Sequence, residues 1–233
     1  MCSSDLLCSI RKLANEIENN LPLDALASAT LRGVQSVKGV KQSGERAGNW
    51  LTLKEAQALL RAPDISTLKG LRDRAVLAVF VGCGLRRNEA AELTFDNIQQ
   101  REARWVIVDL VGKGGKLRTI PMPSWVKQAI DEWANAAEIN SGRVFRAMAK
   151  GDKLAGDSIS PKALRDIVVM YAPDNVAPHD LRRTHAKLAY QGGADLDQIQ
   201  LVLGHASIAT TERYLGLTLD LHNAPGDHIK IGL

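Results

Sequence analysis

The amino-acid sequence predicts a mainly α-helical protein with one small antiparallel β-sheet, an α+β fold class. Most segments carry apolar residues at the three- and four-residue spacing of amphipathic helices. Two β-branched segments, residues 104–111 and 117–122, flank a glycine-rich stretch and predict a hairpin. Strands do not alternate with helices along the chain, and no repeat occurs. This pattern argues against nucleotide-binding folds built on a parallel sheet.

The composition is typical of one globular domain, or of one domain with part of a second. The chain has 233 residues, of which 45% are hydrophobic, and a net charge of +4, which is too small to indicate a nucleic-acid partner by itself. No stretch holds about 18 consecutive apolar residues, and the start lacks a secretory signal, so we expect no membrane partner and a cytoplasmic location. Cys2, Cys8 and Cys83 are spaced irregularly and predict neither a disulfide framework nor a zinc site.

The first part of the chain predicts one helix followed by a linker. Apolar residues in 7–21 follow helical spacing, whereas 36–49 is rich in glycine, serine and charge and has no periodicity. We therefore place a domain boundary near residue 48. The predicted organisation is an N-terminal segment, 1–48, a main domain, 49–222, and a C-terminal tail, 223–233.

The main domain begins with three predicted helices. Thr52 and Glu55 form the pattern of a capping box, which predicts a helix through residue 60. Residues 68–81 are apolar enough for a core helix that ends at the following glycines, and another helix is expected over 86–93. After the hairpin the helical pattern returns, and helix starts and stops are indicated by serine, proline and glycine. The later helices are predicted at 125–137, 161–171, 178–190, 196–203 and 210–217.

Charged residues that could bind a phosphate lie at two predicted helix starts. Arg86 follows a glycine turn, and Glu89, one turn later, could orient it, although Arg87 is as plausible a ligand on charge grounds. His179 and Arg182 are three residues apart on the helix that begins at Pro178, so they share a face near an anion-binding helix terminus. Taken alone, His179 and Arg182 are more typical of a solvated polar helix start, and Arg86 is a weak signal.

The hairpin tip carries Lys113 and Lys116 among glycines. Cations on such a tip can enter a DNA groove or deliver a proton, but solvated lysines are also common there. The phosphate-binding loop pattern GxxxxGK[ST] is absent. Basic residues beside these motifs are predicted DNA contacts: Lys116, Arg118 and Arg183.

His205 and Tyr214 end the set of candidate residues. His205 follows a helix stop, and Tyr214 lies nine residues later on a short helix. A tyrosine can act as a nucleophile, but its ordinary pKa of about 10 leaves little phenolate at neutral pH unless neighbours help. The histidines at 179, 185 and 205 lack the spacing of zinc ligands, so no metal site is expected.

The order of these features is more specific than any one of them. Arg86 in GLRxxE, Lys113 in GKGxK, His179 and Arg182 in HxLR, and LGH followed nine residues later by Tyr214 occur in one sequence. From about Trp50 to Leu217 the chain resembles the catalytic domain of the tyrosine recombinase, or phage integrase, family, which serves phages and other mobile elements. The family's fold is the expected fold here.

The resemblance implies a role for each motif residue. Tyr214 is expected to attack a scissile DNA phosphate, giving a 3′-phosphotyrosyl bond and a free 5′-hydroxyl, while Arg86 and Arg182 bind the non-bridging oxygens. Lys113 is the expected general acid. The remaining expected roles are on the tyrosine proton or the phosphate for His179, on a phosphate oxygen for His205, and as orienter of Arg86 for Glu89.

The implied enzyme is a site-specific DNA recombinase that needs neither metal ion, nor ATP, nor another cofactor. Its implied partners are double-stranded DNA and further copies of itself, as a tetramer on DNA and a monomer when free. Two alternatives remain: nicking and resealing like a type IB topoisomerase, or a non-catalytic DNA-binding fragment. Family members normally have a larger N-terminal helical domain, so 1–48 is expected to be its remnant, and the tail could dock in cis or in trans.

Overall fold

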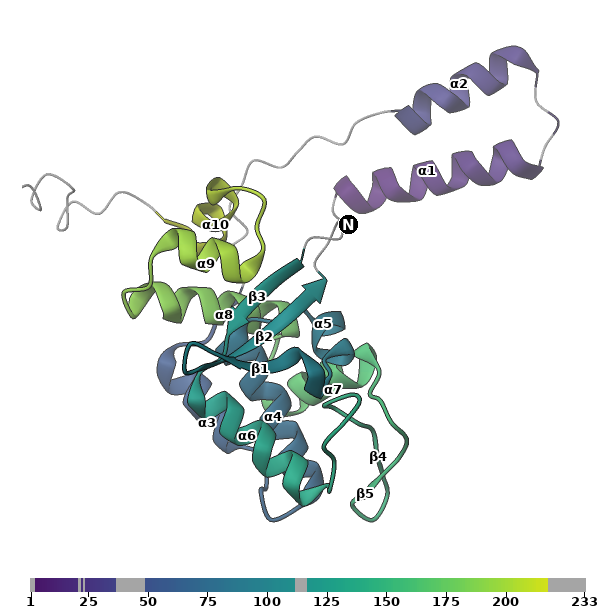
Figure 1. Ribbon diagram of the computed structural model, residues 1–233. Helices are drawn as coiled ribbons and strands as arrows, with labels where there is room; N and C mark the ends of the chain where they lie inside the picture. Colours follow the sequence, from purple (N-terminus) through teal and green to yellow (C-terminus); the bar gives the residue numbers. More distant parts are fainter. Residues whose placement is uncertain (1–2, 21, 23, 37–48, 112–116, 218–233) are drawn as a thin grey trace, which may run out of the picture. The chain divides into compact units, whose positions relative to one another are not determined.

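The computed structural model describes residues 3–20, 22, 24–36, 49–111 and 117–217 (Figure 1). The chain divides into two compact units, Met1–Glu45 and Arg46–Leu233. No helix among the described residues is long and apolar enough to cross a membrane. The predicted tail, 223–233, and most of the predicted linker lie outside the described residues.

The first unit contains two helices, α1 (Ser3–Asn20) and α2 (Ala25–Ser36), which contact each other. The Gln35 side-chain amide on α2 donates 2.7 Å hydrogen bonds to Asn15 and to Glu18 on α1. The sequence predicts the first helix but not the second. The reason is that α2 has a mixed composition with a glycine and small polar residues, so its pairing with α1 is a tertiary feature.

The second unit begins with the predicted capped helix. In α3 (Leu53–Arg61), the Thr52 hydroxyl accepts from the Glu55 amide and the Glu55 carboxylate accepts from the Thr52 amide, which confirms the capping box. The next helix, α4 (Leu68–Cys83), is buried on almost every side. It runs two residues past its predicted end, because its stop is Gly84, which adopts a left-handed φ of +59°.

A three-stranded antiparallel sheet follows the short helices α5 (Arg87–Glu92) and η1 (Phe95–Asn97). The predicted hairpin pair is present, with Ile107 opposite Ile120 in the core. A first strand of the sheet, absent from the prediction, adds an edge to that pair. The strands, in sheet order, are β1 (Ile98–Arg101), β2 (Arg104–Val111) and β3 (Leu117–Pro121).

After the sheet, the described residues up to 217 form helices, connecting loops and a two-stranded ribbon of β4 (Met148–Ala149) and β5 (Lys153–Leu154). These helices agree with the predicted ones to within a few residues at each end. They are α6 (Ser124–Ala136), α7 (Pro161–Tyr171), α8 (Pro178–Gln191), α9 (Leu196–Leu203) and α10 (Ile208–Leu215). The mainly helical fold with small antiparallel sheets confirms the predicted fold class.

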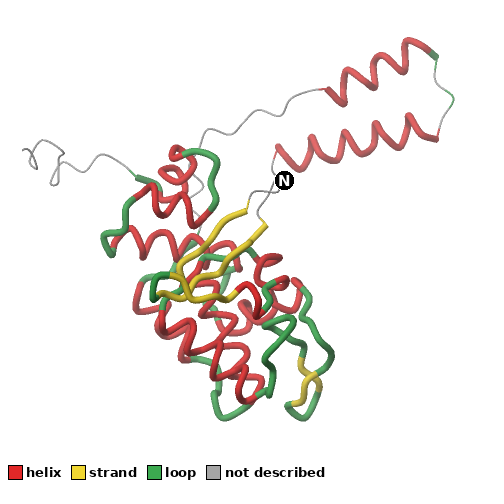
Figure 2. Tube along the Cα trace, in the orientation of Figure 1, coloured by secondary structure: helices red, strands yellow, loops and turns green. Residues whose placement is uncertain are grey.

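The core lies between the sheet and the helices, and α4 and α6 pack against each other; in Figure 2 α6 lies below the strands. Trp133 of α6 is fully buried, and its indole N–H donates to the Val144 carbonyl at 2.9 Å. Cys83 is buried too, and this burial raises the pKa of its thiol to about 12, as expected for a packing residue rather than a reactive one.

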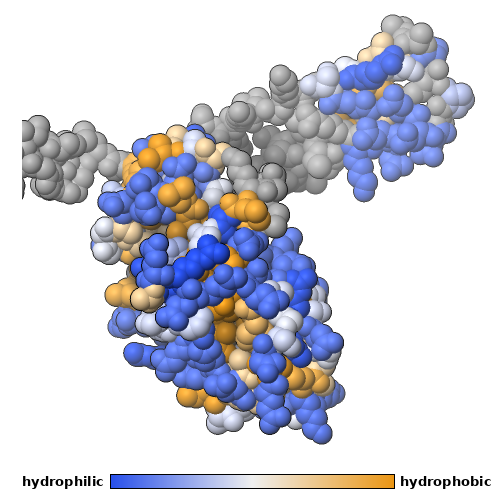
Figure 3. Space-filling model, viewed as in Figure 1, coloured by the Kyte–Doolittle hydropathy of each residue, from blue (hydrophilic) through white to orange (hydrophobic). Residues whose placement is uncertain are grey.

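A second, smaller cluster of buried residues, Ala186, Ile199, Leu203 and Leu215, joins α8, α9 and α10. Figure 3 shows hydrophobic side chains gathered over α9 and α10 and mainly hydrophilic ones over the strands. The buried cluster sets the position of the last two helices, and thereby of Tyr214 on α10 and of His205 in the turn between α9 and α10.

Candidate active site

Arg86 is held by Glu89 at the start of α5. The Glu89 carboxylate accepts from the Arg86 amide at 2.7 Å and from its guanidinium at 2.8 Å. The three-residue spacing makes both bonds possible within the first helical turn. Glu89 is thus paired with Arg86, and the Arg86 side chain remains 35% exposed.

Arg182 enters the site from α8 and is almost completely buried, with 2% of the residue exposed. Its guanidinium donates to the carbonyls of Gly84 and Leu203. The absence of a side chain at Gly84 lets the ring of His185, on the same helix as Arg182, pack closely against it, since a Cβ at this position would lie 2.8 Å from that ring. Burial, followed by the charge of Arg86, lowers the pKa of Arg182 to about 10, so the side chain stays cationic at neutral pH.

The C-terminal end of α9 collects arginines from three different elements. The Leu203 carbonyl accepts from Arg182 and, at 3.4 Å, from Arg86, while the Val202 carbonyl accepts from Arg118 at 3.0 Å. The last carbonyls of a helix have no partner within the helix and carry the negative end of its dipole. Cationic side chains therefore anchor this helix end, which leads through Gly204 to His205.

His205 is fixed by the helix that carries the tyrosine. Its Nδ1 lies 3.0 Å from the hydroxyl oxygen of Thr211, a fully buried residue of α10. Burial, followed by the charges of Arg182 and Arg86, lowers the pKa of His205 to about 4. The imidazole is therefore neutral at neutral pH, and among the described residues no protein group hydrogen-bonds its other nitrogen, which leaves that nitrogen available to a ligand.

Tyr214 of α10 lies between the two histidines of the predicted set. Its ring meets that of His179 edge-on at 5.6 Å between centroids and that of His205 at 5.2 Å. The Tyr214 hydroxyl donates to the His179 carbonyl at 3.3 Å, and the Arg183 guanidinium lies over the ring at 4.9 Å.

Burial and neighbouring charges change the pKa values of Tyr214 and His179. Burial raises the pKa of Tyr214, and the positive charges of Arg182 and Arg183 offset part of that rise. Burial, and next to it the charges of Arg183 and Arg182, lower the pKa of His179. At neutral pH the site therefore holds a neutral phenol and neutral imidazoles among cationic guanidinium groups.

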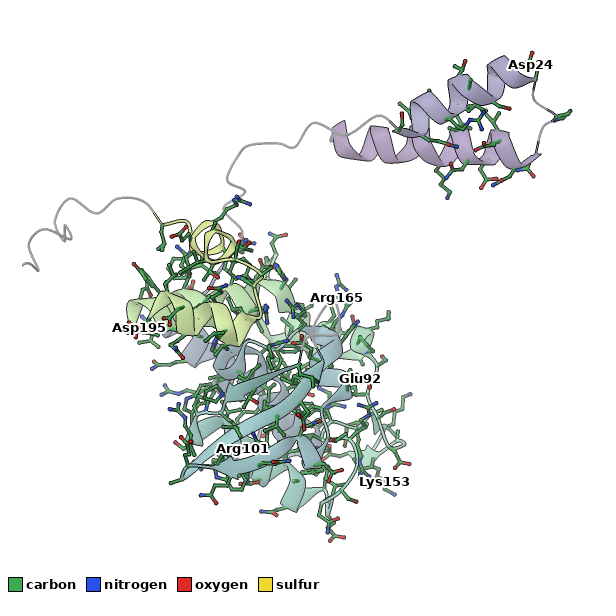
Figure 4. The ribbon with its side chains drawn as sticks, turned by 45° about the horizontal axis from the view of Figure 1, so that its top comes forward. Asp24, Glu92, Arg101, Lys153, Arg165 and Asp195 are labelled. Carbon is green, nitrogen blue, oxygen red and sulfur yellow. The ribbon has the colours of Figure 1, made fainter. Side chains whose placement is uncertain are left out.

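A cavity of about 600 Å³ opens beside these residues. Besides Arg86, Glu89, His179 and Arg182, it is lined by Arg87, Asn88 and Arg165. In Figure 4 Arg165 is labelled on α7, and the contacting helix α5 carries the labelled Glu92. From the sequence, Arg87 is a candidate only in place of Arg86. Arg165 is not predicted, because nothing in the sequence around Arg165 sets it apart from other surface arginines.

The structure thus brings together six predicted residues from four elements: Arg86, Glu89, His179, Arg182, His205 and Tyr214. Arg183, a predicted DNA contact, adjoins them through the Tyr214 ring. Lys113 and Lys116 lie outside the described residues. Arg118 has a different environment from the predicted one: its side chain is only 9% exposed and is paired with Glu89. Among the residues that the structure describes, no three His, Cys, Asp or Glu side chains cluster as metal ligands would.

This arrangement suits the handling of a phosphodiester. Two guanidinium groups next to one another can neutralise an anion, and their fixed hydrogen bonds hold them ready for it. A phenol and two imidazoles nearby supply a nucleophile and groups that donate or accept a proton.

Known proteins with similar sequences belong to one family. Residues 49–219 match the family described as the phage integrase family. The tyrosine recombinase XerC of Rhodospirillum centenum is 40% identical over 167 residues, which is 70% of this chain and 47% of the relative. The tyrosine recombinase XerD of Pseudomonas putida is 31% identical, over 74% of this chain and 59% of the relative. This chain therefore spans about half to three fifths of the length of these relatives.

Solved structures share the fold. XerA recombinase superposes with a TM-score of 0.58 at 19% identity, covering 93% of this chain and 72% of that one. XerH recombinase, described as bound to its difH substrate before cleavage, gives 0.59 at 21% identity, covering 86% of this chain and 63% of that one. These matches confirm the predicted tyrosine recombinase fold. The chain accordingly belongs to the phage integrase family, that is, to the tyrosine recombinases.

Proposed function

We propose that this chain carries the catalytic part of a site-specific recombinase that breaks and rejoins double-stranded DNA through Tyr214. The observation that supports this most directly is the position of the Tyr214 phenol, edge-on to both His179 and His205. Family membership supports it too, because the XerC and XerD relatives are named tyrosine recombinases.

In the proposed step, the Tyr214 oxygen attacks the phosphorus of a scissile phosphodiester. A bond forms between that oxygen and phosphorus as the bond from phosphorus to the 5′-oxygen breaks. The phenolic proton passes to His179 or to a phosphate oxygen, and the departing 5′-oxygen takes up a proton from Lys113. The products are a 3′-phosphotyrosyl bond and a 5′-hydroxyl. A 5′-hydroxyl from a partner strand reverses the step and releases the tyrosine.

Arg86 and Arg182 bind the two non-bridging oxygens in this proposal. Each guanidinium already donates to the Leu203 carbonyl, which fixes the two groups relative to each other before DNA arrives. A preorganised pair of this kind stabilises the extra negative charge of the pentavalent transition state without rearranging. His205 donates to a phosphate oxygen, and its neutral imidazole can do so only through the nitrogen that does not face Thr211.

The proposed partners are double-stranded DNA and other copies of this chain, four of them on two duplexes. Arg183 and Lys116 are proposed DNA contacts, and Arg87 and Arg165, which line the cavity, extend the positive surface away from the scissile phosphate. Each exchange conserves the number of phosphodiester bonds, so the proposed chemistry requires neither ATP nor a metal ion. The DNA target determines whether the natural reaction takes place on a phage, on another mobile element or on a cellular chromosome.

Incubation with supercoiled plasmid in EDTA, without ATP, tests the proposal. After a detergent quench, we expect protein attached covalently to nicked or relaxed DNA, and no such product with Tyr214→Phe. Digestion of the product should leave the DNA fragment attached to a peptide that contains Tyr214. DNA binding without any adduct would contradict the proposal and would favour a DNA-binding module instead.

A further inference from the structure

Arg118 of β3 is built into the site rather than displayed on its surface. Its Nη1 and Nη2 donate to the two carboxylate oxygens of Glu89 at 2.9 and 2.7 Å, and its Nε donates to the Val202 carbonyl at 3.0 Å. The side chain is 9% exposed. A fork of this kind fixes both the distance and the orientation of the two groups that it joins.

Glu89 connects Arg118 to Arg86. The oxygen that accepts from Arg118 Nη1 also accepts from Arg86 Nη1, and the other oxygen accepts from Arg118 Nη2 and the Arg86 amide. One buried carboxylate therefore holds two guanidinium groups. Burial by itself would raise the pKa of Glu89, but the hydrogen bonds from Arg118 and Arg86 outweigh it and lower the pKa to about 2. The carboxylate is thus a permanent anion, and it would be undercompensated if Arg118 were absent.

The bond to Val202 links Arg118 to the other side of the site. Val202 precedes Leu203, whose carbonyl accepts from Arg86 and Arg182, and His205 follows two residues after Leu203. The close packing here is visible at Gly204, where an added Cβ would lie 3.2 Å from Arg118 Cδ. Arg118 therefore contacts both the carboxylate that orients Arg86 and the helix end that leads to His205.

We propose that Arg118 is a positioning residue for the phosphate-binding arginines: it holds Arg86 through Glu89 and the end of α9 through the Val202 carbonyl. This inference deepens the proposed function and rests on it. It assigns Arg118 no contact with DNA, since three of its N–H groups already have protein acceptors and little of the side chain is accessible.

Arg118→Met tests the inference, because methionine fills a similar space without the charge or the fork. We expect adduct formation on supercoiled plasmid at saturating DNA to slow by about 10- to 100-fold, the size of effect that a misplaced catalytic group produces. The DNA concentration for half-saturation should change less than about twofold, and the slope of log affinity against log salt should be unchanged. A direct phosphate contact would instead lower that slope by about one unit.

Arg101→Met is the matched control. Arg101 lies on β1 of the same sheet, is exposed, and donates only a 3.4 Å bond to Gln99 among the described residues (Figure 4). We expect wild-type adduct rates from it. Arg118→Lys keeps the charge but not the fork, and should be slower than wild type and faster than Arg118→Met. It also serves if the methionine variant fails to fold.

A double-mutant cycle distinguishes positioning from a general loss of structure. If Arg118 acts through Glu89, the double variant Glu89→Gln/Arg118→Met should react no more slowly than the slower of the two single variants. Additive losses, a wild-type rate in Arg118→Met, or a lowered salt slope would each overturn the inference.

A measurement without DNA separates the inference from the proposed function. The side-chain ¹⁵N signals of Arg86 in NMR spectra report whether its guanidinium is held by Glu89. We expect these signals to shift and broaden in Arg118→Met and to be unchanged in Arg101→Met. If the wild type forms no adduct, the proposed function fails, and unchanged Arg86 signals in Arg118→Met would show separately that the positioning role is wrong.

Discussion

The Tyr214 hydroxyl donates a hydrogen bond to the backbone carbonyl of His179 at 3.3 Å. The proposed nucleophile is therefore held as a neutral phenol by the helix that carries Arg182, and burial raises its pKa further. In the proposed reaction, a phosphate that enters the site would replace this carbonyl as the partner of the phenol. This hydrogen bond restrains the Tyr214 ring but does not activate the phenol, because the proton remains on the Tyr214 oxygen.

Tyr214→Phe is expected to abolish covalent attachment while leaving DNA affinity within about twofold, because the hydroxyl makes one long hydrogen bond, of 3.3 Å, among the described residues. The ring keeps its edge-on contacts with His179 and His205, so the fold should be retained. A gel-shift titration and a detergent-quenched plasmid assay, made side by side, check the two halves of this prediction. Residual adduct in the variant would show that another residue is the nucleophile.

Arg182→Lys should lower the rate of adduct formation by at least about 100-fold although the charge is kept, since a single ammonium cannot span the two carbonyls of Gly84 and Leu203. The buried carbonyl left without a donor should also cost about 1–3 kcal/mol of unfolding free energy. Urea unfolding and single-turnover kinetics measure the two effects. Arg101→Lys, at an exposed arginine of β1 that does not line the cavity, is the control and should change neither by much. A rate near wild type for Arg182→Lys would remove Arg182 from the site.

The elements that were predictable from the sequence have local causes. α3 begins at the Thr52 capping box, α7 begins at Pro161 after the Ser160 cap, and α9 ends at Gly204 in a left-handed conformation. Each signal lies within four residues of the boundary that it sets. β1 was missed because its sequence, IQQR, has no apolar alternation, so its strand conformation depends on the partner β2.

In the site, too, contacts between residues close in sequence were predictable and contacts between distant residues were not. The pairing of Arg86 with Glu89 follows from their spacing on one helical turn, and the sequence analysis predicted it. Arg118 reaches the same carboxylate from 29 residues away, and the shared acceptor of Arg86 and Arg182 is a backbone carbonyl, that of Leu203. Every residue has a backbone carbonyl, so no sequence motif could have shown which carbonyl accepts these hydrogen bonds. The prediction of Arg118 as a DNA contact took account of its charge but not of this partner.

Stability should fall as the pH drops from about 6.5 toward 5. Burial lowers the pKa of His185 to about 4, although its hydrogen bond to the Val81 carbonyl acts the other way. The unfolded chain takes up a proton near pH 6.5, whereas the folded chain does so only near 4. The stabilisation is therefore complete above pH 6.5 and is lost as the pH falls, at about 1.4 kcal/mol per pH unit for each such group.

His185→Gln keeps an amide that can donate to the Val81 carbonyl and has no titrating group. The slope of unfolding free energy against pH between 6.5 and 5 should fall in this variant by at most about half. His205, with a pKa of about 4, and His179, whose pKa is also lowered, still contribute. Urea unfolding at several pH values in this window measures it. The pKa of Glu89, about 2, confines its own contribution to lower pH. Equal slopes in the two proteins would show that His185 is accessible to protons in the folded state.

Gly204→Ala should impair both stability and adduct formation. The residue has a φ of +60°, which costs an alanine about 1 kcal/mol, and the new Cβ would lie 3.2 Å from Arg118 Cδ. Gly151→Ala carries a similar backbone penalty, at a φ of +81°, but meets nothing within 4 Å on its hairpin between β4 and β5. Both variants should therefore lose about 1 kcal/mol in urea unfolding, and only Gly204→Ala should slow the reaction with plasmid. If the two variants reacted equally fast, the packing of Arg118 against the end of α9 would have no effect on the chemistry, and the hydrogen bond to Glu89 alone would carry its positioning role.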